Sequence, residues 1–248
     1  MVPLERKGLH EVIVNRLALA IFRGEIGNGD LDIFSELHMC RSLQVSRTAL
    51  REAIKVLASK GLVELRPKVG VRVRPRKDWH LLDPDLLAWQ SEAGVDEQFI
   101  RNLCEVRLIV ETAAAGLAAV RATPEERNQL QQRYNEMESN VHDKVVYDRA
   151  DIKFHEAIFA ACHNELLQQM SVTISTALRA QNRSGNDEDL EASMALHKEV
   201  TKTIYGGDQA VARTAMENLI LHTAETFYQT FHPGSTEGWK FYGRPLGT

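Results

Sequence analysis

In the first 60 residues, apolar side chains recur every three to four positions in three short segments. That spacing gathers them on one face of a helix. It predicts three helices, over 12–22, 35–43 and 46–60. Ser46 is of the type that caps a helix N-terminus, and Gly61 is expected to end the third helix. Gln44 and Val45 are expected to form the turn before it.

The next two segments alternate apolar and polar residues, which is the period of a β-strand. Residues 63–66 and 71–74 are expected to pair as a hairpin around the turn at 67–70. The side chains expected on its apolar face are Val63, Leu65, Val71 and Val73. Three helices and a hairpin within about 75 residues describe a winged helix-turn-helix.

The rest of the chain keeps a helical period and shows no convincing strand. A helix is expected to start at Asp83-Pro84, and six more are expected over 97–119, 124–142, 145–162, 165–182, 189–205 and 208–231. Short breaks between them indicate an antiparallel bundle. The predicted fold class is therefore mainly α: an N-terminal winged helix-turn-helix followed by an all-α antiparallel helical bundle.

A charged, proline-containing stretch at 74–78 is the expected linker. We therefore expect a DNA-binding domain over 1–77 and an effector-binding and dimerisation domain over 78–232. The segment 233–248 has no period, and we expect a loosely attached, flexible tail there.

Charge divides the chain at nearly the same place. The net charge is −4, but residues 1–78 hold 15 Lys and Arg against 9 Asp and Glu, and the remainder holds 15 against 25. A basic first third indicates a polyanionic partner for that end. A solvated basic face would give the same count, so the charge alone does not decide.

The cysteines and the termini bear on location. Cys40, Cys104 and Cys162 are widely spaced, which is typical of a reducing cytoplasm rather than of a disulfide framework. The N-terminus is charged from its fifth residue, so we expect no signal peptide. No apolar run is long enough for a membrane helix. The expected location is the cytoplasm.

The third helix carries the candidate DNA-reading residues. A helix-turn-helix inserts the start of its second helix into the major groove, and here that start holds Arg47, Thr48 and Arg51. Arginine can bind guanine O6 and N7 with two hydrogen bonds. The wing offers further contacts, at Lys68, Gly70 and Arg72. The alternative is a solvated arginine-rich helix, but the turn, cap and wing in register favour DNA binding.

Residues 9–74 resemble the signature of the GntR family of bacterial regulators. The resemblance rests on Ser35-Glu36, the segments 45–53 and 61–64, and Gly70. It implies operator DNA contacts at Arg47, Thr48, Arg51 and Gly70. One departure is Leu37, which we expect to face the core and which stands where many members carry an arginine that touches DNA.

The helical part contains a candidate metal site. Asp151 and His155 stand four residues apart, so they share one helix face. Buried Asp and His need partners, which could be each other or a divalent metal. His197 lies with Ser193 on the inward stripe of a later helix. Three such ligands would leave coordination positions open for solvent or an effector.

This part resembles the FCD domain of the FadR subfamily, over roughly residues 97–225. The resemblance rests on Val106-Arg107, Asp151-x3-His155 followed by Asn164, and His197-x10-Asp208. It implies a metal, often zinc, on Asp151, His155, His197 and a third histidine. The position 22 residues after His197 holds Leu219, so His222, about one turn further, is the candidate substitute. A weak site, or a pocket without metal, are the alternatives.

Arg107 is the candidate effector clamp. It shares a helix face with Leu103 and Ala114, where an unpaired charge is costly. One interpretation is an internal pair with Glu111, four residues on. The other, which the resemblance supports, is a two-pronged grip on an effector carboxylate. Ser193 is the second candidate effector contact.

The segment 79–89, which begins and ends with tryptophan, resembles the start of the sensing domain in sugar-acid regulators, above all galactonate-operon repressors. That resemblance implies a polyhydroxy carboxylate as effector. For Trp79 and Trp89 themselves, a plainer interpretation is that they pack the linker onto the bundle.

Together these features predict a homodimeric repressor that binds double-stranded operator DNA and is released by a sugar acid. An activator, or a sensor of another carboxylate, would carry the same features. A metal-dependent hydrolase is the rival class. His155-Glu156 begins like H-E-x-x-H, but position 159 is Phe, so the metalloprotease pair is missing. We therefore expect no enzymatic activity.

Overall fold

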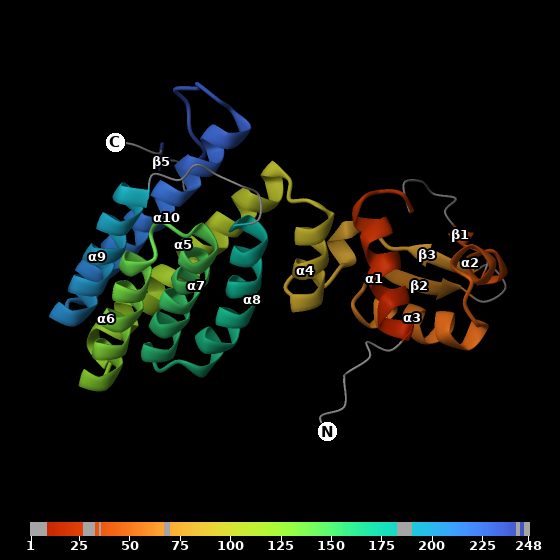
Figure 1. Ribbon diagram of the computed structural model, residues 1–248, viewed down its shortest axis with the longest axis horizontal. Helices are drawn as coiled ribbons and strands as arrows, with labels where there is room; N and C mark the ends of the chain where they lie inside the picture. Colours follow the sequence, from red (N-terminus) through yellow and green to blue (C-terminus); the bar gives the residue numbers. More distant parts are fainter. Residues whose placement is uncertain are drawn as a thin grey trace. The chain divides into compact units, whose positions relative to one another are not determined.

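The computed structural model describes residues 9–26, 33–34, 36–66, 70–182, 190–241 and 244–245. The chain divides into two compact units, Met1–Gly94 and Val95–Thr248. The first contains a three-stranded sheet, and the second consists mainly of helices (Figure 1). Within the described ranges, no helix combines the length and the apolar character needed to span a bilayer.

Three helices surround the core of the first unit: α1 (Leu9–Phe22), α2 (Glu36–Leu43) and α3 (Arg47–Ser59). Ser46 caps α3, since its hydroxyl accepts a hydrogen bond from the Ala49 amide. Gln44 adopts a φ of 55° in the turn before it. Gly61 follows α3 with a φ of 79°, and a Cβ there would lie 2.4 Å from the Asp78 carbonyl oxygen. The predicted turn, cap and stop are confirmed.

The sheet is antiparallel with strand order β1-β3-β2. Its strands are β1 (Ile33–Phe34), β2 (Val63–Arg66) and β3 (Gly70–Val73). The predicted hairpin is confirmed, with Val63 opposite Val73 and Leu65 opposite Val71. The sequence pattern does not predict β1, because a two-residue strand has no alternation to detect.

Two predicted orientations in this unit are wrong. Leu37 is 43% exposed, and Met39 takes its place in the core. Leu65 is 50% exposed, although Val63 and Val71 on the same face are buried. Helical or strand period identifies a face, but only packing decides how far along the element that face is covered.

The next helix, α4 (Pro84–Ala93), belongs to the first compact unit, which ends at Gly94, beyond the domain boundary expected after residue 77. Leu86 and Trp89 complete the core of the winged helix. Trp89 Nε1 also donates a hydrogen bond to Asn15 Oδ1 of α1 at 2.9 Å. The helical period of α4 predicts an apolar face, but it does not indicate which part of the protein covers that face.

Trp79 also packs within the first unit. Its ring lies against Phe22 with centroids 5.1 Å apart, and its Nε1 donates to the Arg74 carbonyl oxygen. The Arg76 guanidinium, in the short 3-10 helix η1 (Arg76–Asp78), lies 5.4 Å from the Trp79 ring. The two tryptophans therefore pack the linker onto the winged helix, and the expectation that they pack it onto the bundle is wrong.

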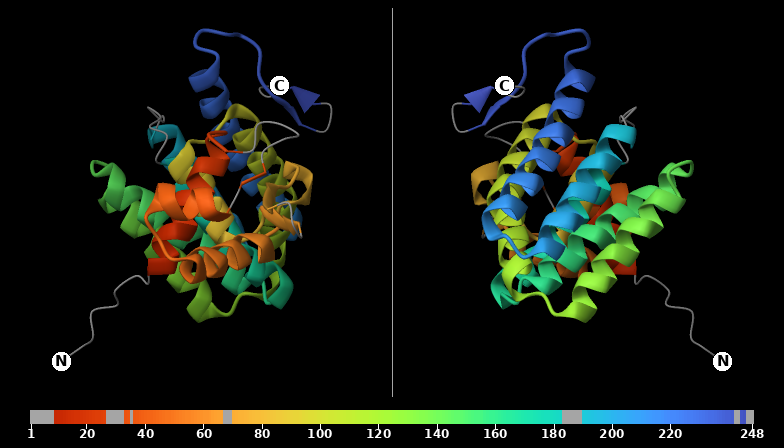
Figure 2. Two further views of the ribbon diagram at one scale, coloured as in Figure 1. Left: turned by 90° about the vertical axis from the view of Figure 1, so that its right-hand side faces the viewer. Right: turned by 90° about the vertical axis from the view of Figure 1, so that its left-hand side faces the viewer.

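In its described part, the second unit is a bundle of six helices. They are α5 (Glu97–Arg121), α6 (Pro124–Ser139), α7 (Lys144–Ala161), α8 (Glu165–Asn182), α9 (Leu190–Gly206) and α10 (Gln209–Phe231). The long helix α5 contacts α7, α8, α9 and α10. Figure 2 shows α9, α6 and α7 running side by side. All six correspond to predicted helices.

Polar caps explain why these helices start where they do. Asp96, Asp143 and Asp208 each accept a hydrogen bond from a backbone amide of the first turn. Thr123 and Glu126 form a reciprocal capping box at the start of α6. Each cap is formed by residues next to the helix that it starts. A break of a few residues is therefore enough to end one helix and begin the next.

The segment after α10 corrects the expectation of a loose tail. Trp239 and Phe241 are each 4% exposed. Trp239 Nε1 donates to Glu97 Oε1 on α5, and His232 Nε2 lies 2.9 Å from the same oxygen. Two short strands, β4 (Lys240–Phe241) and β5 (Arg244–Pro245), pair here, where the sequence pattern predicts no strand. Aromatic packing on α10 holds this segment, and such packing leaves no periodic signal.

Candidate functional site

The helix α3 has two chemically different faces. Three apolar side chains, each no more than 1% exposed, face the core: Leu50, Ile54 and Leu57. Arg47, Thr48 and Arg51 are exposed on the opposite side of the first turns. An element that is anchored on one side and cationic on the other has the form of a recognition helix.

The wing residues are placed in part. Gly70 begins β3 with a φ of 132°, a region of backbone conformation that favours glycine. Arg72 follows on the same strand; its side chain is 32% exposed, with Nη1 3.9 Å from Glu64 Oε1. Lys68, and Ser35 before α2, lie outside the described residues.

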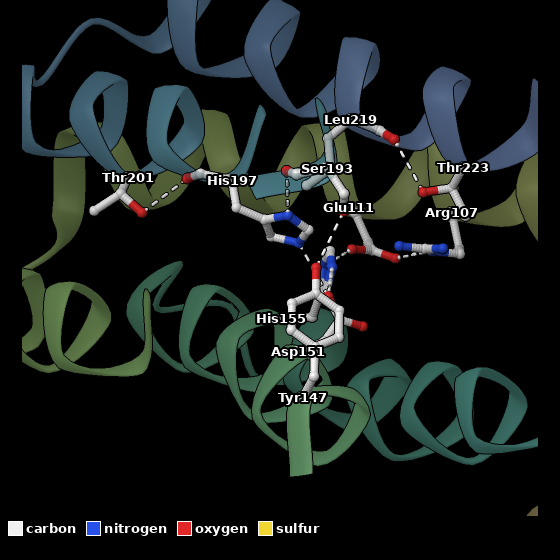
Figure 3. A network of polar contacts seen from close by, with 10 residues as sticks. All are labelled: Arg107, Glu111, Tyr147, Asp151, His155, Ser193, His197, Thr201, Leu219 and Thr223. Atoms are coloured by element: carbon white, nitrogen blue, oxygen red, sulfur yellow. Dashed lines mark hydrogen bonds and ion pairs between the residues drawn. The ribbon is translucent and has the colours of Figure 1, made fainter. Parts of the chain in front are cut away.

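A row of buried charged side chains crosses the second unit (Figure 3). Arg107 and Glu111 lie one turn apart on α5, and His155 comes from α7. Arg107 Nε donates to Glu111 Oε1 at 2.6 Å, and His155 Nδ1 forms an ion pair with Glu111 Oε2. The three side chains are no more than 3% exposed. The internal pair considered for Arg107 is therefore present, and each Glu111 oxygen has its own partner.

Asp151 and His197 extend this row. His197 Nε2, from α9, lies 3.0 Å from Asp151 Oδ1, and His155 Nε2 lies 3.6 Å from the same oxygen. The Asp151 side chain is 15% exposed. One ligand atom from each of the three residues lies within 4.8 Å of the others. The structure thus brings together three of the four predicted metal ligands.

Hydrogen bonds on the far side of both rings orient their lone pairs. His197 Nδ1 lies 2.8 Å from the Ser193 carbonyl oxygen, which can only accept, so Nδ1 carries a hydrogen. His155 Nδ1 is paired with the Glu111 carboxylate, which can only accept, so this Nδ1 carries a hydrogen as well. Both Nε2 atoms then face one Asp151 oxygen, and acceptors so placed repel unless a proton or a metal cation lies between them. Two imidazoles and a carboxylate are a donor set that suits zinc.

Two hydroxyl groups adjoin this corner. The Tyr147 hydroxyl lies 3.1 Å from Ser193 Oγ, and both side chains are buried. Tyr147 stands one turn before Asp151 on α7, as Figure 3 shows. Polar hydrogen-bonding groups therefore continue beyond the three ligands.

Burial and charge act in opposite directions on the ionisable groups. Burial alone would raise the pKa of Glu111, but the charge of Arg107 lowers that pKa to about 2. Burial alone would lower the pKa of His155, but the Glu111 charge and the Asp151 hydrogen bond raise it to about 9. Burial would also raise the pKa of Asp151, and hydrogen bonds from the two histidines hold it well below its usual range.

The fourth predicted ligand does not join the cluster. His222 lies on α10 with Nε2 buried and, among the described residues, without a hydrogen-bond partner. The described group that could hold an ion consists of Asp151, His155 and His197. Leu219 is 1% exposed in the core. His222 is not part of this group, so its role as a substitute for a third histidine stays a prediction.

Two residues of the site escape the sequence pattern. The i+4 spacing identifies Glu111 only as a partner of Arg107, whereas its second oxygen is paired with a residue of α7. Tyr147 precedes Asp151 and His155 at successive four-residue steps, so the shared helix face was the signal that could have identified it.

Two family models match this chain. The model of bacterial regulatory proteins of the gntR family matches residues 9–73, and that of the FCD domain matches residues 102–222. The galactonate operon transcriptional repressor of Escherichia coli (strain K12) is 34% identical over 189 residues, which are 75% of this chain and 82% of the repressor. The chain belongs to the gntR family. This gntR regulator carries an FCD domain in its second unit.

More distant similarities also extend over most of the chain. A putative L-lactate dehydrogenase operon regulatory protein of Escherichia coli (strain K12) is 28% identical to this gntR regulator over 222 residues, 87% of this chain and 84% of the relative. Among solved structures, that of Lar, which controls the expression of the Listeria monocytogenes agr system, has a TM-score of 0.60 at 20% identity. It covers 93% of this chain and 100% of Lar, and at that identity it shows the fold alone.

Membership of the gntR family decides between the classes of function. The matching families and relatives are transcription regulators, so this gntR protein is a DNA-binding transcription regulator and not an enzyme. Its helix-turn-helix implies operator DNA, and its FCD domain implies an effector. The hydrolase alternative is set aside.

Proposed function

We propose that this gntR regulator is a homodimeric, cytoplasmic repressor of a sugar-acid operon, and that the sugar acid releases it from operator DNA. The observation that carries the proposal is the 34% identity to the galactonate operon repressor over 75% of this chain. An aldonate such as D-galactonate is the proposed effector.

The proposed DNA contacts lie on α3 and on the wing. Arg47, Thr48 and Arg51 contact base edges or phosphates in the major groove. The wing contacts phosphates through Lys68, Gly70 and Arg72. A homodimer presents two such helices to two half-sites, so we expect a near-palindromic operator.

The proposed cation site consists of Asp151, His155 and His197, and zinc is the cation that this donor set favours. Three protein ligands leave coordination positions open for an effector. Imidazoles must be neutral to coordinate, so a bound divalent ion, Arg107, Glu111 and Asp151 would together carry one net positive charge. That balance favours an effector with a single carboxylate.

Arg107 and Ser193 are the proposed effector contacts. A guanidinium has five N–H donors, so an effector carboxylate can join Glu111 on Arg107. Ser193 Oγ, with the Tyr147 hydroxyl beside it, offers hydrogen bonds to a polyhydroxy chain. Because Arg107 is only 2% exposed, binding requires the helices to separate locally, which gives the bundle a second state for the effector to select.

A second effector has support from a different relative. The putative regulator of the L-lactate dehydrogenase operon is 28% identical to this chain. L-lactate also combines one carboxylate with a hydroxyl group, so the charge argument applies to it equally.

The test is release of the full-length protein from an operator duplex that is selected from a random pool. Gel-shift titrations would compare D-galactonate, L-lactate and chloride, each with zinc and after chelation. We expect D-galactonate to release the operator at the lowest concentration and zinc to strengthen its effect. Release by L-lactate alone would overturn the sugar acid, and no release by either carboxylate would overturn effector control.

A further inference from the structure

One buried carboxylate, Glu111, connects the proposed effector contact with the proposed cation site. Arg107 Nε donates to its Oε1 at 2.6 Å, and His155 Nδ1 pairs with its Oε2. Glu111 itself is 1% exposed, so water cannot easily replace either contact. A change at Glu111 therefore removes a partner from both Arg107 and His155.

The contact with His155 determines what the other ring nitrogen can do. An imidazole has two nitrogens, and the hydrogen bond at one fixes the role of the other. With Nδ1–H held by Glu111, Nε2 is the nitrogen that faces Asp151 Oδ1, 3.6 Å away, and the one left to bind a cation once its proton is lost. A carboxylate behind a ligand histidine fixes the ring and raises its basicity toward a metal.

We propose that Glu111 is the positioning residue that sets the cation affinity of this site, and that Arg107 holds Glu111 in place. The inference rests on the proposed cation site and not on the identity of the effector. Arg107 thereby acts on the cation through Glu111, in addition to its proposed contact with the effector.

The second ligand histidine shows why Glu111 is the residue to alter. His197 Nδ1 is supported by a backbone carbonyl, that of Ser193, at 2.8 Å. A substitution cannot remove that group. The support of His155 comes from a charged side chain, so it can be changed without touching any of the three ligands.

The experiment measures the zinc affinity of the full-length protein by competition with a chromophoric chelator. In Glu111→Gln the side chain keeps its size, but one of the two oxygens that pair with Arg107 and His155 becomes an NH2 group, which cannot accept a hydrogen bond. We expect zinc affinity to fall about 10–100-fold. The visible spectrum of the cobalt(II) form should change as well, because the imidazole is no longer held in one orientation.

A matched control is available on the same helix. Glu97 of α5 also contacts a histidine, His232, at 2.9 Å, but it lies outside the cluster. Glu97→Gln should leave zinc affinity and the cobalt(II) spectrum unchanged. A general effect of losing a carboxylate from α5 would instead appear in both variants and would overturn the specific role of Glu111.

A double variant keeps the test decisive if Glu111→Gln does not fold. Arg107→Met with Glu111→Leu removes both charges, and such replacements of a buried pair are often neutral for stability. It should show the same loss of zinc affinity. Parent-like affinity in the Glu111 variants that fold would overturn the inference and leave the cation site intact. A parent protein that binds no zinc would overturn the cation site itself.

Discussion

The charged side chains of α3 and those of the bundle differ in their exposure to water and in their dependence on partners. Arg47 is exposed, so water and salt screen it and its side chain contributes little to folding. Arg107 is 2% exposed and paired with Glu111, which in turn contacts His155. A surface charge is available to a partner, whereas a buried charge is stable only while all its partners remain.

This difference indicates how each half can change its specificity. If the exposed face of α3 contacts bases as proposed, a substitution there would alter which bases are read without disturbing the core below it. In the cluster, each side chain completes the bonding of another, so a single substitution leaves a buried group without its partner. We expect operator preference to vary by single steps, and the effector site to vary by matched sets of changes.

The sharpest test of this contrast is Arg107→Ala. We expect the free energy of unfolding to fall by about 3–5 kcal/mol, because Glu111 stays buried and loses its guanidinium. Chemical denaturation would measure the loss. Arg133→Ala, at a side chain that is 39% exposed and paired with Glu136, is the control, with an expected change within about 0.5 kcal/mol. Equal losses in the two variants would contradict the contrast.

The second test is pH. Burial lowers the pKa of His155, but Glu111 and Asp151 raise it to about 9, so zinc must displace a proton at neutral pH. Zinc affinity should therefore rise by about tenfold per pH unit well below pH 9, and by about fiftyfold between pH 7 and 9. Chelator competition across that range measures it, and a flat profile above pH 7 would contradict the raised pKa.

Stability of the metal-free protein should move the opposite way. A pKa raised from 6.5 to about 9 stabilises the fold fully below pH 6.5, and that contribution is lost as pH rises through about 9. Melting curves of chelated protein at several pH values would show the loss.

Arg47→Ala is expected to have a smaller effect, confined to DNA. Loss of a base contact should weaken operator binding by about 1–3 kcal/mol without changing the free energy of unfolding. Fluorescence anisotropy with operator and random duplexes separates base reading from phosphate contact. If both duplexes lose the same affinity, Arg47 reads no base.

The smallest expected effect concerns the start of α3. Ser46→Ala removes the acceptor for the Ala49 amide and should lower the free energy of unfolding of the first unit by about 1 kcal/mol. Ser46→Asn keeps a capping oxygen and should restore most of it. Thermal denaturation measures both, and an unchanged Ser46→Ala protein would show that the cap contributes nothing.

Features encoded by neighbours in the chain could be predicted from the sequence. The helix predicted over 145–162 runs as α7 from Lys144 to Ala161, because its period and its Asp143 cap are both local. The positions of Trp89 and Trp239 could not be predicted. Each depends on a partner far away in the chain, Asn15 for one and Glu97 for the other.

The residues of the site also fall into those that the sequence predicts and those that it does not. Asp151 and His155 share a face at i and i+4, and the inward stripe of α9 adds His197, so spacing groups the three candidate ligands and the resemblance to the FCD domain adds the metal. The second bond of Glu111 depends on how α5 packs against α7. The position of His222 depends on the rotation of α10. Neither is a property of one helix, so neither leaves a pattern in the sequence.

The bond between Trp89 and Asn15 has a practical consequence for anyone who isolates the DNA-reading half. A fragment that stops at residue 77 lacks α4 and uncovers the apolar side chains of α1 that α4 covers. Newly exposed apolar patches promote aggregation, so that fragment would be hard to purify. A fragment that ends at Gly94 retains α4 and a closed core, and it is the piece to express.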